Sequence, residues 1–151
     1  MAGTVRLHRV LKAPPQRVYK AFLDPDALAK WMAPYGFTGR VHHIDPREGG
    51  SYHMSFTNFS TGVTHSFGGT YHELRPGELI RYTDRFDASD DSPLAGEMTM
   101  TVTFRAVTAG TELTIVQEGV PDAIPVDMCY LGWQESLAQL ANLVEPEIPD
   151  V

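Results

Sequence analysis

The feature that most constrains this chain is a long alternation of apolar and polar residues. It is clearest where Met98, Met100, Val102 and Phe104 are separated by threonines. Successive side chains of a β-strand point to opposite faces of a sheet, so this segment predicts a strand with one apolar face. The same alternation occurs in residues 52–56, 80–86 and 113–115. Turn residues separate the segments at 46–50, 58–62, 76–77, 89–93 and 109–110. The pattern therefore predicts an antiparallel meander.

A long helical pattern follows the meander in residues 126–144. Its apolar residues are spaced by three or four positions, as in Trp133, Leu137 and Leu140, and Pro146 ends it. Such spacing places the apolar side chains on one face of a helix. A sheet with one apolar face must cover that face, and this helix is the only predicted element large enough to do so.

The start of the chain predicts three smaller elements. Residues 5–11 mix apolar and basic side chains and predict a strand near a sheet edge. A short helix is expected from Pro15, because proline suits the first helical position. Asp24 followed by Pro25 predicts a second short helix, since aspartate accepts hydrogen bonds from the first exposed amides. The expected fold is one α+β domain over residues 1–151, in the order β-α-α-β6-α.

Composition and charge exclude several classes of protein. Hydrophobic residues make up 42% and charged residues 21% of the chain, as in ordinary globular domains. The formal net charge of −7 opposes nucleic-acid binding, which depends on clustered Lys and Arg. No apolar run is long enough to span a bilayer, and the N-terminus lacks a secretory signal. Because the single cysteine, Cys129, cannot form an internal disulfide, we expect a cytoplasmic protein.

A resemblance to a known family is carried by the segments APPQRVYKAFLDPDALAKW, DPREGG, GGTYHELRPGELI, TMTVTF, GTELTIVQEG and YLGWQESLAQL. Together they resemble the branch of the START-like (SRPBCC) superfamily that is similar to the activator of heat-shock-protein-90 ATPase. The resemblance implies the helix-grip fold, in which a curved antiparallel sheet wraps around a long C-terminal helix and leaves a cavity. The superfamily includes lipid-transfer domains, pollen-allergen-like carriers and polyketide cyclases.

Methionine and aromatic residues form the candidate ligand-binding set. Methionine adapts its shape, and Tyr and Trp combine an apolar body with a polar tip, so a cavity lined by them suits a flat or oily ligand. The alternative is that the same residues fill a solid core. Tyr52 belongs to the set, and the other candidates are Trp31, Met54, Phe56, Phe67, Tyr71, Tyr82, Phe86, Met98, Met100, Val102, Met128, Trp133 and Leu137.

Asp84 is the best candidate for acid–base chemistry. It lies between Tyr82 and Phe86 on the parity that faces inward. There it would either be hydrogen-bonded within the cavity or have its pKa raised by desolvation. His65 is a candidate partner across the sheet, and Glu135 a candidate from the helix. The alternative is a bulge that turns Asp84 outward. No metal or cofactor is expected, because the histidines and the cysteine lack ligand spacing.

Three functions of different classes remain open. The leading interpretation is a module that binds a small hydrophobic molecule between the sheet and the last helix. The second is a cofactor-free enzyme similar to polyketide cyclases or aromatases, and the third is a chaperone-interaction protein similar to the ATPase activator. Whether the chain catalyses any reaction, and whether it forms a homodimer, stays open.

Overall fold

The computed structural model describes residues 2–150 and shows the expected order of elements. The elements are β1 (Gly3–Leu11), α1 (Pro15–Leu23), α2 (Pro25–Trp31), β2 (Phe37–Ile44), β3 (Ser51–Asn58), β4 (Thr64–Arg75), β5 (Leu79–Phe86), β6 (Met98–Val107), β7 (Gly110–Val120) and α3 (Val126–Val144). The predicted β-α-α-β6-α order is therefore confirmed. No described helix is long and apolar enough to cross a membrane.

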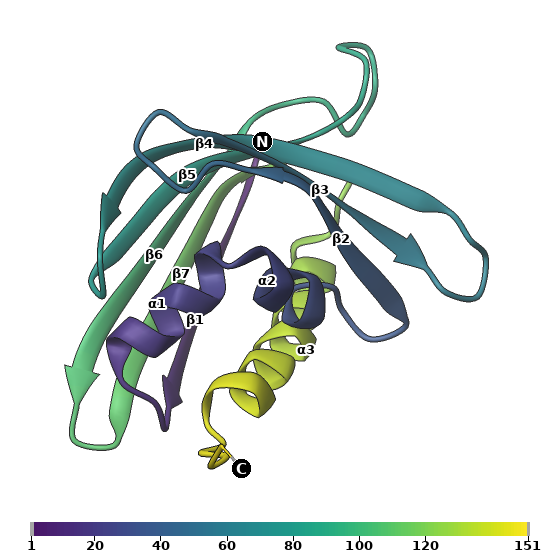
Figure 1. The fold of residues 1–151 in the computed structure, drawn as a ribbon. Coiled ribbons are helices and arrows are strands. Elements are labelled where there is room, and N and C mark those ends of the chain that lie inside the picture. Colours follow the sequence, from purple (N-terminus) through teal and green to yellow (C-terminus); the bar gives the residue numbers. More distant parts are fainter. Residues whose placement is uncertain (1, 151) are drawn as a thin grey trace.

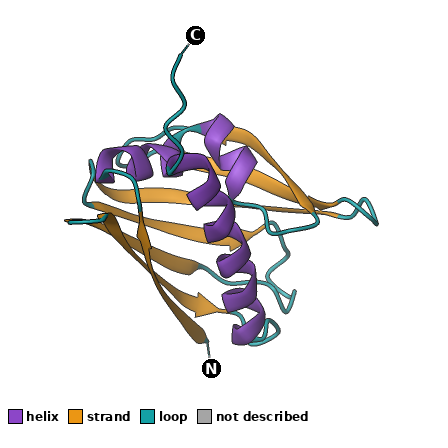
Figure 2. Cartoon of the chain, turned by 90° about the horizontal axis from the view of Figure 1, so that it is seen from below, coloured by secondary structure: helices purple, strands orange, loops and turns teal. Residues whose placement is uncertain are grey.

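The strands form one curved antiparallel sheet. It has 7 strands in the order β1-β7-β6-β5-β4-β3-β2, so β1 lies at one edge, as predicted, and β2 at the other. The sheet arches over the three helices, and α3 crosses its concave face (Figures 1 and 2). This arrangement is the helix-grip fold that the family resemblance implies.

Two adjacent glycines allow the sheet to bend near the site described below. A Cβ on Gly68 would collide with the carbonyl oxygen of Tyr52, and one on Gly69 with the carbonyl oxygen of Thr83. The buried hydroxyl of Thr83 accepts a hydrogen bond from the backbone N–H of Thr70 at 3.1 Å, in place of a ladder bond. Only glycine permits so close an approach within a strand, as the sequence predicts for this pair.

The two short helices are fixed by local hydrogen bonds. The Asp24 carboxylate accepts from the backbone N–H groups of Asp26 and Ala27 at 2.9 and 3.0 Å, as an N-cap does. The indole N–H of Trp31 donates to the carbonyl of Ala21 at 2.8 Å. Trp31 is fully buried and packs edge-on against Phe22, which holds α2 against α1.

Side chains of α3 bind the C-terminal end of α2. The Ser136 hydroxyl donates to the carbonyl of Met32 at 2.6 Å, and the Gln139 amide donates to the carbonyls of Trp31 and Ala33. The last carbonyls of a helix have no partner within the helix, so these bonds satisfy groups that would otherwise be unpaired. They also fix the position of α3 relative to α2.

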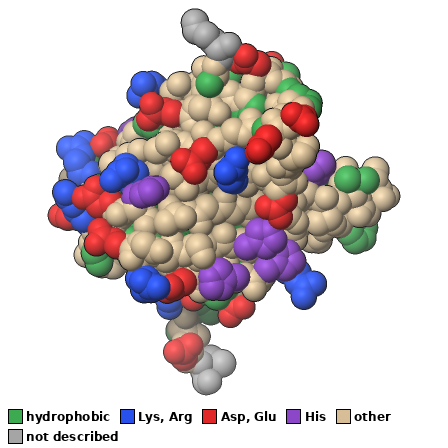
Figure 3. Space-filling view, turned by 90° about the horizontal axis from the view of Figure 1, so that it is seen from above, with side chains coloured by type: hydrophobic (Ala, Val, Ile, Leu, Met, Phe, Trp, Pro, Cys, Tyr) green, Lys and Arg blue, Asp and Glu red, His purple; other side chains and the backbone are tan. Residues whose placement is uncertain are grey.

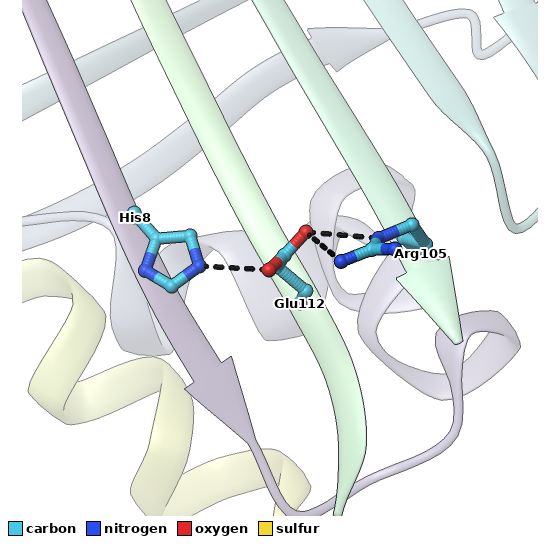
Figure 4. A network of polar contacts seen from close by, with 3 residues as sticks. All are labelled: His8, Arg105 and Glu112. Atoms are coloured by element: carbon cyan, nitrogen blue, oxygen red, sulfur yellow. Dashed lines mark hydrogen bonds and ion pairs between the residues drawn. The ribbon is translucent and has the colours of Figure 1, made fainter. Parts of the chain in front are cut away.

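The outer face of the sheet carries polar networks. In Figure 4, Glu112 on β7 accepts from His8 on β1 at 3.1 Å and from Arg105 on β6 at 2.9 Å. Histidines also gather on the convex face (Figure 3), where the His42 and His53 rings lie 5.2 Å apart. These groups are solvated, so solvent and salt weaken their interactions.

Candidate functional site

A cavity of about 290 Å³ lies between the concave face of the sheet and the first half of α3. Its volume is close to the lower end of the range for small-molecule sites, about 300–1,000 Å³. The walls are mainly aromatic and aliphatic, with few polar groups. The lining residues are Phe22, Leu28, Met32, Pro34, Tyr52, Met54, Phe56, His65, Phe67, Tyr71, Ile80, Tyr82, Asp84, Phe86, Met98, Met100, Gln117, Val120, Ile124, Cys129, Gly132, Trp133 and Ser136.

Most of the predicted ligand-binding residues lie together in this wall. The alternation along β3, β4, β5 and β6 points them to the concave face, and Trp133 approaches from α3. The predicted residues that line the cavity are Met54, Phe56, Phe67, Tyr71, Tyr82, Phe86, Met98, Met100 and Trp133, together with Tyr52.

Four predicted residues do not line the cavity. Trp31, Val102 and Leu137 are buried in the solid core, where the helices pack directly on one another and on the sheet. Met128 is 59% exposed on the solvent side of α3. A step of one residue rotates a helical side chain by about 100°, so Met128 points away although Cys129 lines the cavity.

Several lining residues were not singled out from the sequence. Gln117 continues the inward parity of β7, so strand alternation alone could have identified it. Its side-chain carbonyl accepts from the Trp133 indole N–H at 2.9 Å, and its amide contacts the Met98 sulfur at 3.2 Å. Gly132 and Ile124 carry no sequence signal of this kind, because their positions depend on how α3 is placed over the sheet.

Asp84 lies in the cavity wall, and the outward bulge considered as an alternative does not occur. The Tyr52 hydroxyl donates to Asp84 Oδ1 at 2.8 Å. Burial raises the pKa of Asp84 to about 7, although the hydrogen bonds from Tyr52 and from the backbone of Arg85 act in the opposite direction. Asp84 is half-buried and is one of the residues that line the cavity. Its carboxyl group can therefore exchange a proton near neutral pH.

Three tyrosines gather beside Asp84. The ring centroids of Tyr52, Tyr71 and Tyr82 lie 5.5 to 5.9 Å apart. Burial is the main reason that the pKa of Tyr52 and of Tyr82 is raised well above its usual value, and the nearby charge of Asp84 adds to the effect. Burial also raises the pKa of Tyr71. All three therefore stay neutral at physiological pH and present hydroxyl groups.

His65 and Glu135 do not act as partners of Asp84 in this structure. Phe67 pairs with Phe86, so His65 and Asp84 lie on opposite sides of that pair. They are offset by about 13 Å along the strands. His65 lies at the exposed rim of the cavity, and Glu135 instead accepts from the backbone N–H of Tyr35 at 3.2 Å. The partner of Asp84 is Tyr52, which sequence reasoning did not assign to it.

Metal ligation has no geometric basis in the part of the chain that the structure describes. Residues 2–150 contain no group of three or more His, Cys, Asp or Glu side chains that could hold an ion. On the convex face, His53 binds Asp87 at 2.7 Å and His42 binds Ser55 at 2.8 Å. Both pairs lie outside the cavity.

Comparisons with known proteins identify the family. A crystal structure of a Chromobacterium violaceum protein is 60% identical, with a TM-score of 0.92, and the match covers 95% of this chain and 98% of that one. A Rhodobacter sphaeroides protein matches at 20% identity and TM-score 0.79, covering 95% of both chains. The Silicibacter pomeroyi protein named AHSA1 matches at 20% identity and TM-score 0.79, covering 93% of this chain and 96% of that one. The last two show the fold alone.

The family model gives the assignment over nearly the whole domain. A comparison with curated proteins gives no match. The model described as "Activator of Hsp90 ATPase homolog 1-like protein" matches residues 12–145, which include both short helices, the cavity strands and α3. The chain therefore belongs to the family of Activator of Hsp90 ATPase homolog 1-like proteins.

Proposed function

We propose that this protein binds a small hydrophobic molecule in the cavity between the sheet and α3. The observation that supports the proposal best is the cavity itself, about 290 Å³ in volume and walled mainly by Met and aromatic side chains. The cavity is partly open to solvent, and its apolar wall is therefore in contact with water when no ligand is bound. An apolar molecule that enters it removes this wall and its own surface from water, which favours binding.

Gly132 offers a way to test this proposal. It lies on α3 in the cavity wall, and a Cβ at this position would meet only Pro34 Cγ, at 4.0 Å. A large side chain can therefore extend from Gly132 into the cavity without collision at its first atom. Gly132→Ala is a matched control, because it adds only one methyl group. Replacing a helix glycine by alanine should stabilise the helix by about 0.5–1 kcal/mol.

The test is a titration with an apolar dye that fluoresces when it leaves water. We expect saturable binding of one dye per chain by the wild type and by Gly132→Ala, and loss of binding by Gly132→Phe. Thermal unfolding of each variant checks that it remains folded. Weak, non-saturating fluorescence from the wild type, or equal binding by Gly132→Phe, would contradict the proposal.

A catalytic role is the second candidate, and the hydrogen bond between Tyr52 and Asp84 favours it. A carboxyl group that exchanges its proton near neutral pH can serve as a general acid or base, as a cofactor-free reaction of the cyclase or aromatase kind requires. Turnover of a ligand by the wild type, together with its loss in Asp84→Asn while binding persists, would favour this candidate over a carrier.

Stimulation of a chaperone ATPase is the third candidate, and family membership favours it. A partner surface outside the cavity needs exposed apolar side chains. Met128 and Leu131, three residues apart on α3, are 59% and 51% exposed. This candidate agrees with a cytoplasmic location, which is the compartment that we propose. The test is to measure the ATPase rate of Hsp90 with and without this protein. An unchanged rate would remove it.

A further inference from the structure

The described cavity wall contains a negatively ionisable side chain but no Lys or Arg to neutralise it. Asp84 is the one carboxylate in the lining of residues 2–150, and no Lys or Arg lines the cavity. Cys129 also lines it, and burial raises the pKa of its thiol, which keeps the sulfur neutral. His65 lies at the rim, offset from Asp84 along the strands. Among the described residues, the wall therefore holds a carboxylate that accepts hydrogen bonds and no permanent cation.

Asp84 also has acceptor capacity to spare. A carboxylate has about four lone-pair sites. Two protein donors use part of that capacity, the hydroxyl of Tyr52 at 2.8 Å and the backbone N–H of Arg85. The remaining sites are available to a group inside the cavity. Among the described residues, every fully buried side-chain nitrogen or oxygen atom has a hydrogen-bond partner. The hydroxyl groups of Tyr71 and Tyr82 form no hydrogen bond with any described residue, so neither oxygen is fully buried.

We propose, building on the proposed function, that the ligand is a compact, flat, apolar molecule with a hydrogen-bond donor at one end, an amine or a hydroxyl, that donates to Asp84. When Asp84 is ionised, the same geometry disfavours apolar molecules that end in a carboxylate, such as fatty acids. Two carboxylates in an apolar cavity repel each other, and no cation in the described wall compensates for the second.

The groups around Asp84 set the expected pH dependence. Tyr52 on β3, Tyr71 on β4 and Tyr82 on β5 stay neutral, and Cys129 on α3 does as well. Asp84 ionises as the pH rises through about 7. Affinity for an amine should therefore rise over this interval, while affinity for a carboxylate should fall.

Three probes with the same aromatic body test the proposal by calorimetry: naphthylmethylamine, naphthylmethanol and naphthylacetate. At about pH 8, where Asp84 is ionised, the amine should bind wild-type protein about tenfold or more tightly than the acetate, with the alcohol between them. Binding of all three should be lost in Gly132→Phe, which locates them in the cavity.

Two variants isolate the role of Asp84. Asp84→Asn should reduce the difference between amine and acetate to about twofold or less, because the amide carries no charge. Asp87→Asn removes the same charge from an exposed residue that binds His53 outside the cavity, and it should keep the wild-type preference. If Asp84→Asn fails to fold, the ratio measured on the wild type still decides.

The outcomes separate this inference from the proposed function. Equal or tighter binding of the acetate by the wild type overturns the inference and leaves the cavity function intact. If the dye saturates but none of the three probes binds, the inference also fails while the cavity function stands. If neither dye nor probe binds, both fail.

Discussion

At the scale of single residues, Asp84 is the clearest case of an ionisable group in an apolar environment. A buried carboxylate is unfavourable unless it is paired with a cation or well hydrogen-bonded, and here its side-chain partner is the neutral hydroxyl of Tyr52. The result is a pKa of about 7 instead of the ordinary 3.8.

The raised pKa of Asp84 predicts a dependence of stability on pH. The folded state binds this proton more tightly than the unfolded state, so the contribution of Asp84 is most favourable below pH 3.8 and is lost as the pH rises through about 7. Relative to Asp84→Asn, the wild type should lose roughly 1.4 kcal/mol of unfolding free energy per pH unit in that interval.

Chemical denaturation of both proteins across this pH range measures the effect. Subtracting the two curves cancels the titration of all other groups, and Asn keeps a carbonyl oxygen that can accept from Tyr52. Parallel curves for wild type and variant would show that the Asp84 pKa is not raised in the folded protein.

Single residues show what the sequence could and could not predict about the site. The inward parity of Asp84 followed from its place between Tyr82 and Phe86 in a strand. Met128 is exposed and does not line the cavity, because methionine content can indicate a pocket but does not reveal which side of a helix faces it. His65 was wrongly paired with Asp84, because parity gives the face of the sheet and not the offset along it.

At the scale of elements, hydrogen bonds connect α3 to the C-terminal end of α2. Gln139 donates to two carbonyl groups at the end of α2, and Ser136 donates to a third. These bonds hold α3 at a fixed place over the sheet. Leu137, Leu140 and Val144 pack in the solid core, while the first turns of the helix stand over the cavity.

Removal of the Gln139 side chain should therefore weaken the fold. Gln139→Ala leaves two part-buried carbonyl groups without their partner, which should cost about 1–3 kcal/mol. Asn142→Ala, at an exposed position of the same helix, should change stability by less than about 0.5 kcal/mol. Urea unfolding compares the two. Equal midpoints would show that water replaces the Gln139 bonds without loss.

The elements themselves were predictable because their signals are local. Alternation identified the strands, proline and Asp24 marked the starts of the short helices, and spacing marked α3. The position of α3 over the sheet was not predictable, because it depends on contacts such as Gln139 with Trp31 that join residues far apart in sequence. The sequence pattern alone therefore could not distinguish a solid core from a core with an open cavity.

At the scale of the whole molecule, the three helices cover only part of the apolar, concave face of the sheet. The three helices lie against the concave face (Figures 1 and 2). Beneath the first half of α3 the side chains leave a cavity. The family and its fold agree with this architecture. Because a fold does not by itself determine function, the proposal of ligand binding rests on the residues of the cavity wall and not on the family.

The most direct test of ligand binding is native mass spectrometry of the chain purified from its source. The proposal predicts a small apolar molecule that travels with the wild-type protein at one copy per chain and is released by denaturation. Gly132→Phe, purified in the same way, should carry none, while Gly132→Ala should retain it. The mass of the bare polypeptide in all three proteins, or the same adduct on Gly132→Phe, would contradict ligand binding in the cavity.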